Sequence, residues 1–141
     1  MSADSLASRI AQSMLAAEGT GPAWGVEIEE AREGYARIRM RLRPDMLNGH
    51  GIGHGGMIFA LADTAFAYAC NSRNLRSVAA QASIVFLDSA REGESLTAEC
   101  EERALVGRSG VYDVRVTGEG GRSIAEFQGF SRSIGGAVIE T

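Results

Sequence analysis

Residues 54–71 read HGGMIFALADTAFAYACN, and this stretch decides the fold of the 141-residue chain. Between Met57 and Cys70 every residue is hydrophobic except Asp63 and Thr64. A segment that is apolar on all sides predicts a buried helix rather than a surface helix, here from about Gly55 to Asn71. At about 1.5 Å per residue such a helix is roughly 25 Å long, enough to cross a sheet of ordinary width.

Asp63 is the only charged residue of this apolar run. Burying a carboxylate costs free energy unless the group is paired or used, and acids with perturbed protonation gather in active sites. Two interpretations follow: a structural ion pair with an arginine (or a polar interface contact), and a catalytic acid. The glycines Gly55 and Gly56 at the helix start favour the catalytic interpretation, because glycine lets a ligand approach the backbone closely.

The sequence before this helix predicts one helix and one hairpin. Residues 4–18 carry apolar side chains at helical spacing, which predicts a short amphipathic helix that ends at Gly19. From Trp24 the apolar residues alternate on both sides of a turn at Glu33-Gly34, which predicts an antiparallel hairpin with one buried face. Glutamates and arginines alternate on the other face, so we expect opposite charges to pair across the two strands.

Four further strands are predicted after the helix, over residues 77–87, 95–106, 110–117 and 122–134. Glycines separate them. The order of elements predicts an α+β fold in one domain, residues 1–141, in which an antiparallel sheet wraps around the long central helix. A helix that is apolar on all sides needs cover beyond one sheet, which indicates a partner subunit.

Composition excludes several classes of protein. The net charge of −4 argues against nucleic acid as a partner, and all 14 basic residues are arginines, which excludes lysine Schiff-base chemistry. Asp63 interrupts the longest apolar run, so we expect no membrane span, and no secretion signal is evident. We expect a cytoplasmic protein in which Cys70 and Cys100 are buried thiols rather than a disulfide or a metal pair. Neither a metal nor a cofactor is expected.

Two motifs connect the chain to a known family. Residues 48–56 read NGHGIGHGG and residues 61–66 read LADTAF, and the match extends through residues 68–72, YACNS. This pattern strongly resembles the hotdog-fold acyl-coenzyme A (CoA) thioesterases, and most closely the branch of the phenylacetate pathway. The resemblance implies a hotdog fold and hydrolysis of an aromatic acyl-CoA, phenylacetyl-CoA or a ring-hydroxylated relative. It also implies a homo-oligomer, a dimer at least, with a dimer of dimers favoured.

The physical chemistry of the helix start agrees with this resemblance. The first N–H groups of a helix lack intrahelical partners and lie at its positive end, so the Gly55 N–H suits a thioester carbonyl oxygen that becomes an oxyanion. Asp63 lies eight residues further on, roughly 12 Å along the same helix, too far to serve that carbonyl within one chain. In the family the two groups come from opposite subunits, whose helices run antiparallel. Asp63 would activate a water or attack the carbonyl itself, and the sequence does not choose.

The resemblance also implies supporting and CoA-binding residues. Asn48 matches the family position that contacts the thioester or the attacking water. Thr64 either helps to hold that water or bonds to its own helix backbone. The turn that contains Arg108 and Ser109 resembles the family loop near the coenzyme's phosphates, and Arg73 is a weaker candidate. Arginine suits phosphate, although both arginines could be ordinary surface residues.

His50 and His54 are the only histidines, and they keep a second enzyme class open. A histidine with an acid in a hotdog fold is the arrangement of hydroxyacyl dehydratases, which however lack this combination of motifs. We expect His54, together with Gly56, to order the loop and helix start. A third possibility is a non-catalytic acyl-CoA-binding module. The loop lacks the Walker lysine and the Rossmann spacing, which argues against a nucleotide-phosphate cradle.

Overall fold

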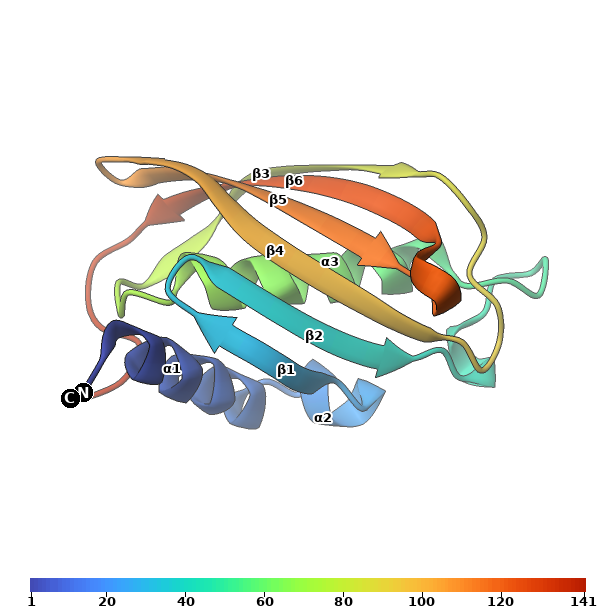
Figure 1. Ribbon diagram of the computed structural model, residues 1–141, viewed down its shortest axis with the longest axis horizontal. Coiled ribbons are helices and arrows are strands. Elements are labelled where there is room, and N and C mark those ends of the chain that lie inside the picture. Colours follow the sequence, from blue (N-terminus) through green and yellow to red (C-terminus); the bar gives the residue numbers. More distant parts are fainter.

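The computed structural model describes residues 1–141, and six antiparallel strands curve around one long helix (Figure 1). In chain order the elements are α1 (Ala3–Ala17), α2 (Thr20–Trp24), β1 (Glu27–Arg32), β2 (Tyr35–Arg41), the 3₁₀ turn η1 (Pro44–Met46), α3 (Gly55–Cys70), β3 (Ser77–Phe86), β4 (Ser95–Val106), β5 (Ser109–Thr117), the 3₁₀ turn η2 (Glu119–Gly121) and β6 (Ser123–Ser133). The strand order is β1-β2-β4-β5-β6-β3, and every neighbouring pair is antiparallel. The predicted α+β architecture is confirmed.

Helix α3 lies across the concave face of the sheet and supplies the centre of the core (Figure 1). Ring packing joins the helix to the sheet: the centroid of Phe66 lies 5.5 Å from that of Tyr112 on β5 and 5.9 Å from that of Phe127 on β6. The contact with β6 requires glycine, because a Cβ at Gly129 would lie 2.8 Å from the Phe66 ring. The predicted buried helix is therefore present.

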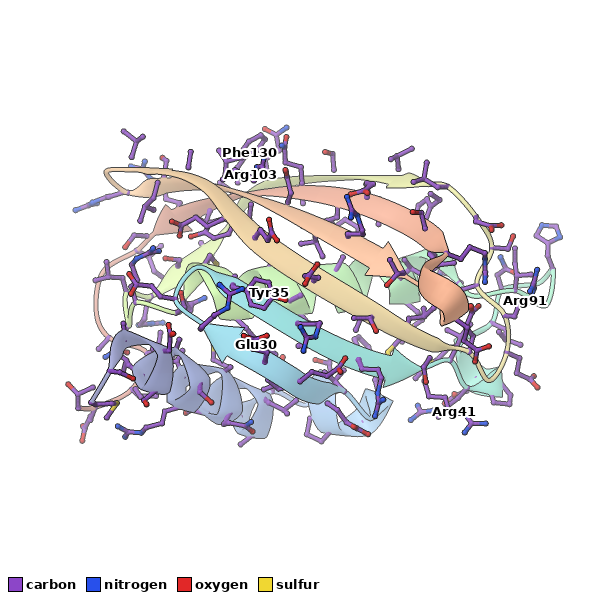
Figure 2. The ribbon with its side chains drawn as sticks, in the orientation of Figure 1. Glu30, Tyr35, Arg41, Arg91, Arg103 and Phe130 are labelled. Atoms are coloured by element: carbon purple, nitrogen blue, oxygen red, sulfur yellow. The ribbon has the colours of Figure 1, made fainter.

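The hairpin of β1 and β2 turns at Glu33-Gly34, as predicted, and Gly34 has the positive φ (72°) that favours glycine. Its outer face carries the expected cross-strand ion pairs, Arg39 with Glu27 at 2.9 Å and Arg37 with Glu30 at 3.3 Å. In Figure 2 the Glu30 and Tyr35 labels mark this hairpin. Exposed pairs of this kind contribute little stability, so this arginine stripe is a solvated face.

The predicted strand start at Trp24 is wrong. Trp24 ends the short helix α2, and β1 begins only at Glu27. The helix stops at Gly25, which adopts the left-handed conformation (φ 68°) and donates its N–H to the carbonyls of Gly21 and Pro22. Pro22 lies within the first turn of α2, where a missing N–H costs nothing, so it does not break this helix.

One edge of the sheet and one stripe of α3 remain uncovered. Strand β3 ends the strand order, and Val78, Val85 and Phe86 on it are 47%, 53% and 50% exposed. An edge strand with exposed apolar side chains invites pairing with another chain. On α3, a stripe at helical spacing stays only half-buried; it includes Ala60, Asp63, Thr64 and Ala67. No helix of the structure has the length and hydropathy needed to span a membrane.

Candidate active site

The first turn of α3 leaves one backbone donor without a partner in the chain. His54 is the N-cap residue, and its Nδ1 accepts the Gly56 N–H at 2.9 Å. The carbonyl of His54 accepts the N–H groups of Met57 and Ile58 at 3.0 and 3.2 Å. The Gly55 N–H is thus the orphan donor of this helix start, at the positive end of the helix dipole.

A cavity of about 440 Å³ opens beside this donor. It is lined by Asn48, Ile52, Gly53, Gly55 and Ile58 from the loop and α3, and by Phe86, Leu87, Asp88, Ser89 and Ala90 from the end of β3 and the β3–β4 connection. This volume lies in the range of small-molecule sites. The structure therefore brings together two residues that the sequence singled out, Asn48 and Gly55.

Asn48 orders the loop that leads to the helix. Its Oδ1 accepts the N–H of His50 at 2.9 Å and that of Ile52 at 3.3 Å, a local turn typical of asparagine. Its side-chain NH₂ group has no partner in the chain. The amide can therefore donate to a ligand in the cavity while its oxygen keeps the loop in place.

Asp63 lies half-buried on the uncovered stripe of α3 and does not line the cavity of its own chain. No arginine of its own chain pairs with it, so Asp63 forms no ion pair within the chain. Burial raises the pKa of the Asp63 carboxyl, with no opposing partner. An unpaired carboxyl of raised pKa on an uncovered face is available for chemistry with a second molecule.

The neighbouring residues have local structural tasks. Thr64 donates its hydroxyl to the Ala60 carbonyl at 2.7 Å, which is the second of its two predicted arrangements. Gly56 leaves room for the capping ring, because a Cβ there would lie 2.9 Å from the Nδ1 of His54. His50 lies exposed in the loop before the helix, and its side chain has no partner.

The predicted CoA-binding residues lie at the other end of α3. Arg73 and Arg108 line a small cavity of about 40 Å³, and Ser109 begins β5 directly after Arg108. The guanidinium of Arg73 bonds to Glu33 at 2.8 Å and to Glu102, so its charge is already balanced. Arg108 has no ion pair and keeps its charge free.

No sequence motif pointed to the residues from Phe86 to Ala90. They form one side of the cavity, and a Cβ at Gly55 would lie 3.1 Å from the Phe86 ring. One signal was available: the strand that begins at Ser77 ends in four successive apolar residues, Ile84, Val85, Phe86 and Leu87. Such a run is typical of a segment that contacts other groups on both faces.

The two cysteines are not suited to nucleophilic chemistry. Both are free thiols, Cys100 buried and Cys70 half-buried. Burial raises the pKa of Cys70 to about 12 and the pKa of Cys100 further above its ordinary value. A thiol with a raised pKa is a poor nucleophile, because the thiolate is the reactive form.

The chain is similar to known thioesterases in sequence and in fold. The model of the thioesterase superfamily matches residues 50–125. The chain is similar to the acyl-coenzyme A thioesterase PaaI of Escherichia coli K12, with 41% identity over 128 residues that cover 91% of each protein. The structure is also similar to that of the E. coli PaaI protein from the phenylacetic acid degradation operon, with a TM-score of 0.94 and 40% identity over 96% of this chain and 99% of that one.

The chain is also similar to a protein that was solved with a ligand. A hypothetical thioesterase of Streptococcus pneumoniae, solved with coenzyme A, gives a TM-score of 0.77 and 28% identity over 79% of this chain and 88% of that one. The TM-scores show that both solved structures share the fold of this chain, and the family match agrees with them, so the predicted hotdog fold is confirmed.

Proposed function

Because this chain belongs to the thioesterase superfamily, we propose that it hydrolyses an aromatic acyl-CoA thioester, phenylacetyl-CoA or a ring-hydroxylated relative, to the free acid and CoA. The observation that carries the proposal is the unpartnered Gly55 N–H beside Asn48 in the 440 Å³ cavity. The aromatic preference is supported by the E. coli relative, which comes from the phenylacetic acid degradation operon. We place the enzyme in the cytoplasm, as its sequence predicts.

In the proposed reaction the Gly55 N–H donates to the thioester carbonyl oxygen and stabilises the charge that develops there. The carboxylate of Asp63 activates a water for attack on the carbonyl carbon, or attacks it directly to give a mixed anhydride that water then hydrolyses. The leaving group is a thiolate whose conjugate acid has a pKa near ~8.5, so it departs without a strong general acid. A carboxylate and an oxyanion donor therefore suffice, with Asn48 positioned to contact the thioester or the water.

The site requires two subunits. Gly55 and Asp63 of one chain are about 12 Å apart along α3, beyond the reach of one carbonyl group. The exposed edge of β3 and the half-buried stripe around Asp63 support a second copy whose α3 runs antiparallel to the first. We propose a dimer at least, and a dimer of dimers in which Leu105 and Val106, 46% and 77% exposed at the β4–β5 turn, offer a second apolar surface.

A shared site predicts complementation between two inactive variants. D63N lacks the carboxylate, and G55P lacks the oxyanion donor. In a mixed dimer one of the two sites combines an intact Gly55 with an intact Asp63, so random mixing should restore about a quarter of the wild-type activity. The variants are unfolded together, refolded and assayed against each variant refolded alone. A mixture that stays inactive although mass spectrometry detects mixed dimers would show that each site lies within one chain.

We propose that the phosphates of CoA bind near Arg108 and Ser109, with Arg73 beside them. The free guanidinium of Arg108 supports its role, since arginine binds phosphate through charge-assisted hydrogen bonds. The ion pairs of Arg73 with Glu33 and Glu102 support a role in shaping this end of the site rather than in neutralising phosphate. The relative from S. pneumoniae solved with coenzyme A supports CoA as the carrier.

A thiol-release assay over a panel of acyl-CoA substrates tests the proposed function. Release of free CoA, fastest with phenylacetyl-CoA or its ring-hydroxylated relatives, is the expected result. Formation of an enoyl product from a hydroxyacyl-CoA would favour the dehydratase, and tight binding without turnover would favour the binding module. Either of these outcomes would contradict the proposal.

The histidines provide a prediction that separates the two enzymes. A thioesterase driven by Asp63 and the Gly55 N–H needs neither ring as a base, so H50N and H54N should each lose less than ~10-fold in kcat. Asparagine is a good N-cap residue, so H54N keeps a partner for the Gly56 N–H, whereas H54A should lose about 1 kcal/mol of stability. Steady-state kinetics and thermal unfolding of the three variants check this. A loss beyond ~10³-fold in a folded H54N, with one limb of the pH profile gone, would identify His54 as the base.

A further inference from the structure

We infer that Arg122 is a positioning residue of the proposed active site: it holds the connection from β3 to β4 against the loop that leads to Gly55. The inference rests on the proposed function, because the group it positions is the oxyanion donor. In Figure 1 the connection between β3 and β4 descends at the right-hand end of the molecule, where η2 and the loop before α3 also lie. Figure 2 labels Arg91 at this end.

The guanidinium of Arg122 makes four hydrogen bonds, more than that of any other arginine in the chain. Its Nε donates to Asp88 at 2.8 Å, and its Nη2 donates to the carbonyl of Ser89 at 2.6 Å. Its two terminal nitrogens also hold both carboxylate oxygens of Glu94, at 2.8 and 3.0 Å. Asp88 and Ser89 line the cavity beside Gly55, whereas Arg122 does not. Arg122 therefore bonds directly to two residues of the cavity wall without being part of that wall.

Glu94, the main partner of Arg122, is itself held in place by backbone hydrogen bonds. It is 5% exposed and accepts two backbone N–H groups, those of Arg91 and Glu119, at 2.9 Å each. The hydrogen bonds from Arg122 lower the pKa of Glu94 to about 2, so the pair stays ionised throughout the range in which an enzyme works. Glycine is required beside it, because a Cβ at Gly118 would lie 2.3 Å from the Glu94 carboxylate.

The β3–β4 connection transmits this position to the helix start. The carbonyl of Ala90 accepts the Gly53 N–H at 2.8 Å, and a Cβ at Gly53 would lie 3.0 Å from that of Ala90. Gly53 directly precedes His54, whose ring caps α3 and leaves the Gly55 N–H free. A shift of the Ala90 carbonyl therefore moves the peptide next to the cap. Displacements of about 1 Å at a catalytic group can cost ~10²-fold in rate.

Arg122→Lys tests the positioning role. Lysine keeps a positive charge near the buried Glu94, but one ammonium cannot reproduce the planar fork that holds Glu94, Asp88 and the Ser89 carbonyl together. We expect kcat for phenylacetyl-CoA to fall at least ~10-fold with KM changed less than ~3-fold. A misplaced Gly55 N–H weakens a hydrogen bond that is made mainly in the transition state, so it affects kcat more than KM. The matched control is Arg115→Lys, which alters a single ion pair with Glu126 on the outer face and should change kcat less than ~2-fold.

Amide exchange provides a readout that needs no activity. The Gly53 N–H should exchange at least ~10-fold faster in R122K than in wild type, since its acceptor is no longer held. Unchanged exchange, or unchanged kcat in an active wild-type background, would overturn the inference. A wild type without thioesterase activity would contradict the proposed function instead, and the exchange measurement would then decide the positioning role alone. If R122K does not fold, D88N replaces it, with an expected ~3-fold loss of kcat; unchanged kcat in D88N would overturn the inference.

Discussion

Replacing Asp63 by asparagine is expected to reduce kcat for acyl-CoA hydrolysis at least ~10²-fold, as the loss of a positioned acid–base group normally does. Asparagine has the same shape but neither takes up a proton from water nor attacks the thioester. The stripe of α3 around Asp63 forms no ion pair, so the fold and CoA binding should persist. Thiol release and isothermal titration with CoA check both statements. The control D113N alters an exposed carboxylate on the outer face and should keep full activity.

The raised pKa of Asp63 adds a pH dependence with a defined sign. Burial makes the folded-state pKa higher than the unfolded-state pKa, so the carboxyl contributes stability at low pH that is lost as the pH rises through the folded-state value. Above it the buried charge destabilises the fold, and D63N should therefore unfold at the same or a higher temperature than wild type at neutral pH. The acid limb of kcat should lie above the range of an ordinary aspartate. Near-normal turnover of D63N would leave Asp63 as an interface contact only.

Hydrophobic patterns in the sequence predicted most of the fold, because the long helix and most strands have a pattern that is typical of one kind of element. An apolar run without strand alternation predicted α3 to within one residue at its end, and the alternating segments after it predicted the four later strands closely. Trp24 shows the limit. It continues the alternation of β1 towards the N-terminus, but the left-handed conformation of Gly25 ends a helix there. The alternation of Trp24 with Val26 predicts a strand, whereas a glycine that can end a helix permits a short helix before it. Here the helix forms, and no sequence pattern shows which of the two structures is preferred.

The site was predictable only where it is local in sequence. Asn48 and Gly55 lie seven residues apart and share a motif, and the structure brings both to one cavity. The other side of that cavity, with Phe86 and Asp88, is brought there by the pairing of β3 with β6, and Arg122, which directly follows η2, bonds to it. Such contacts depend on tertiary packing rather than on spacing. From sequence Arg73 was the weaker of the two arginine candidates, and only the structure shows that its charge is already neutralised by glutamates, whereas that of Arg108 is not.

Replacing Gly55 by proline is expected to lower kcat by about 10²–10³, the usual cost of losing one oxyanion donor. Proline removes the N–H and is tolerated at the first helical position, where that N–H has no intrahelical partner and φ is already suited to its ring. The residue before it must be extended, and His54 already is, with φ −65° and ψ 130°. Kinetics with phenylacetyl-CoA give the rate, and circular dichroism with thermal unfolding checks that α3 still forms.

The matched control is Gly55→Ala, which adds a Cβ but keeps the N–H. The new methyl group meets the Phe86 ring, which is half exposed and can move by the few tenths of an ångström required, so G55A should lose less than ~10-fold in kcat. A large loss in G55P with a small loss in G55A assigns the effect to the hydrogen bond. Equal losses in the two variants would assign it to crowding at Phe86, and Gly55 would then shape the cavity without stabilising the oxyanion.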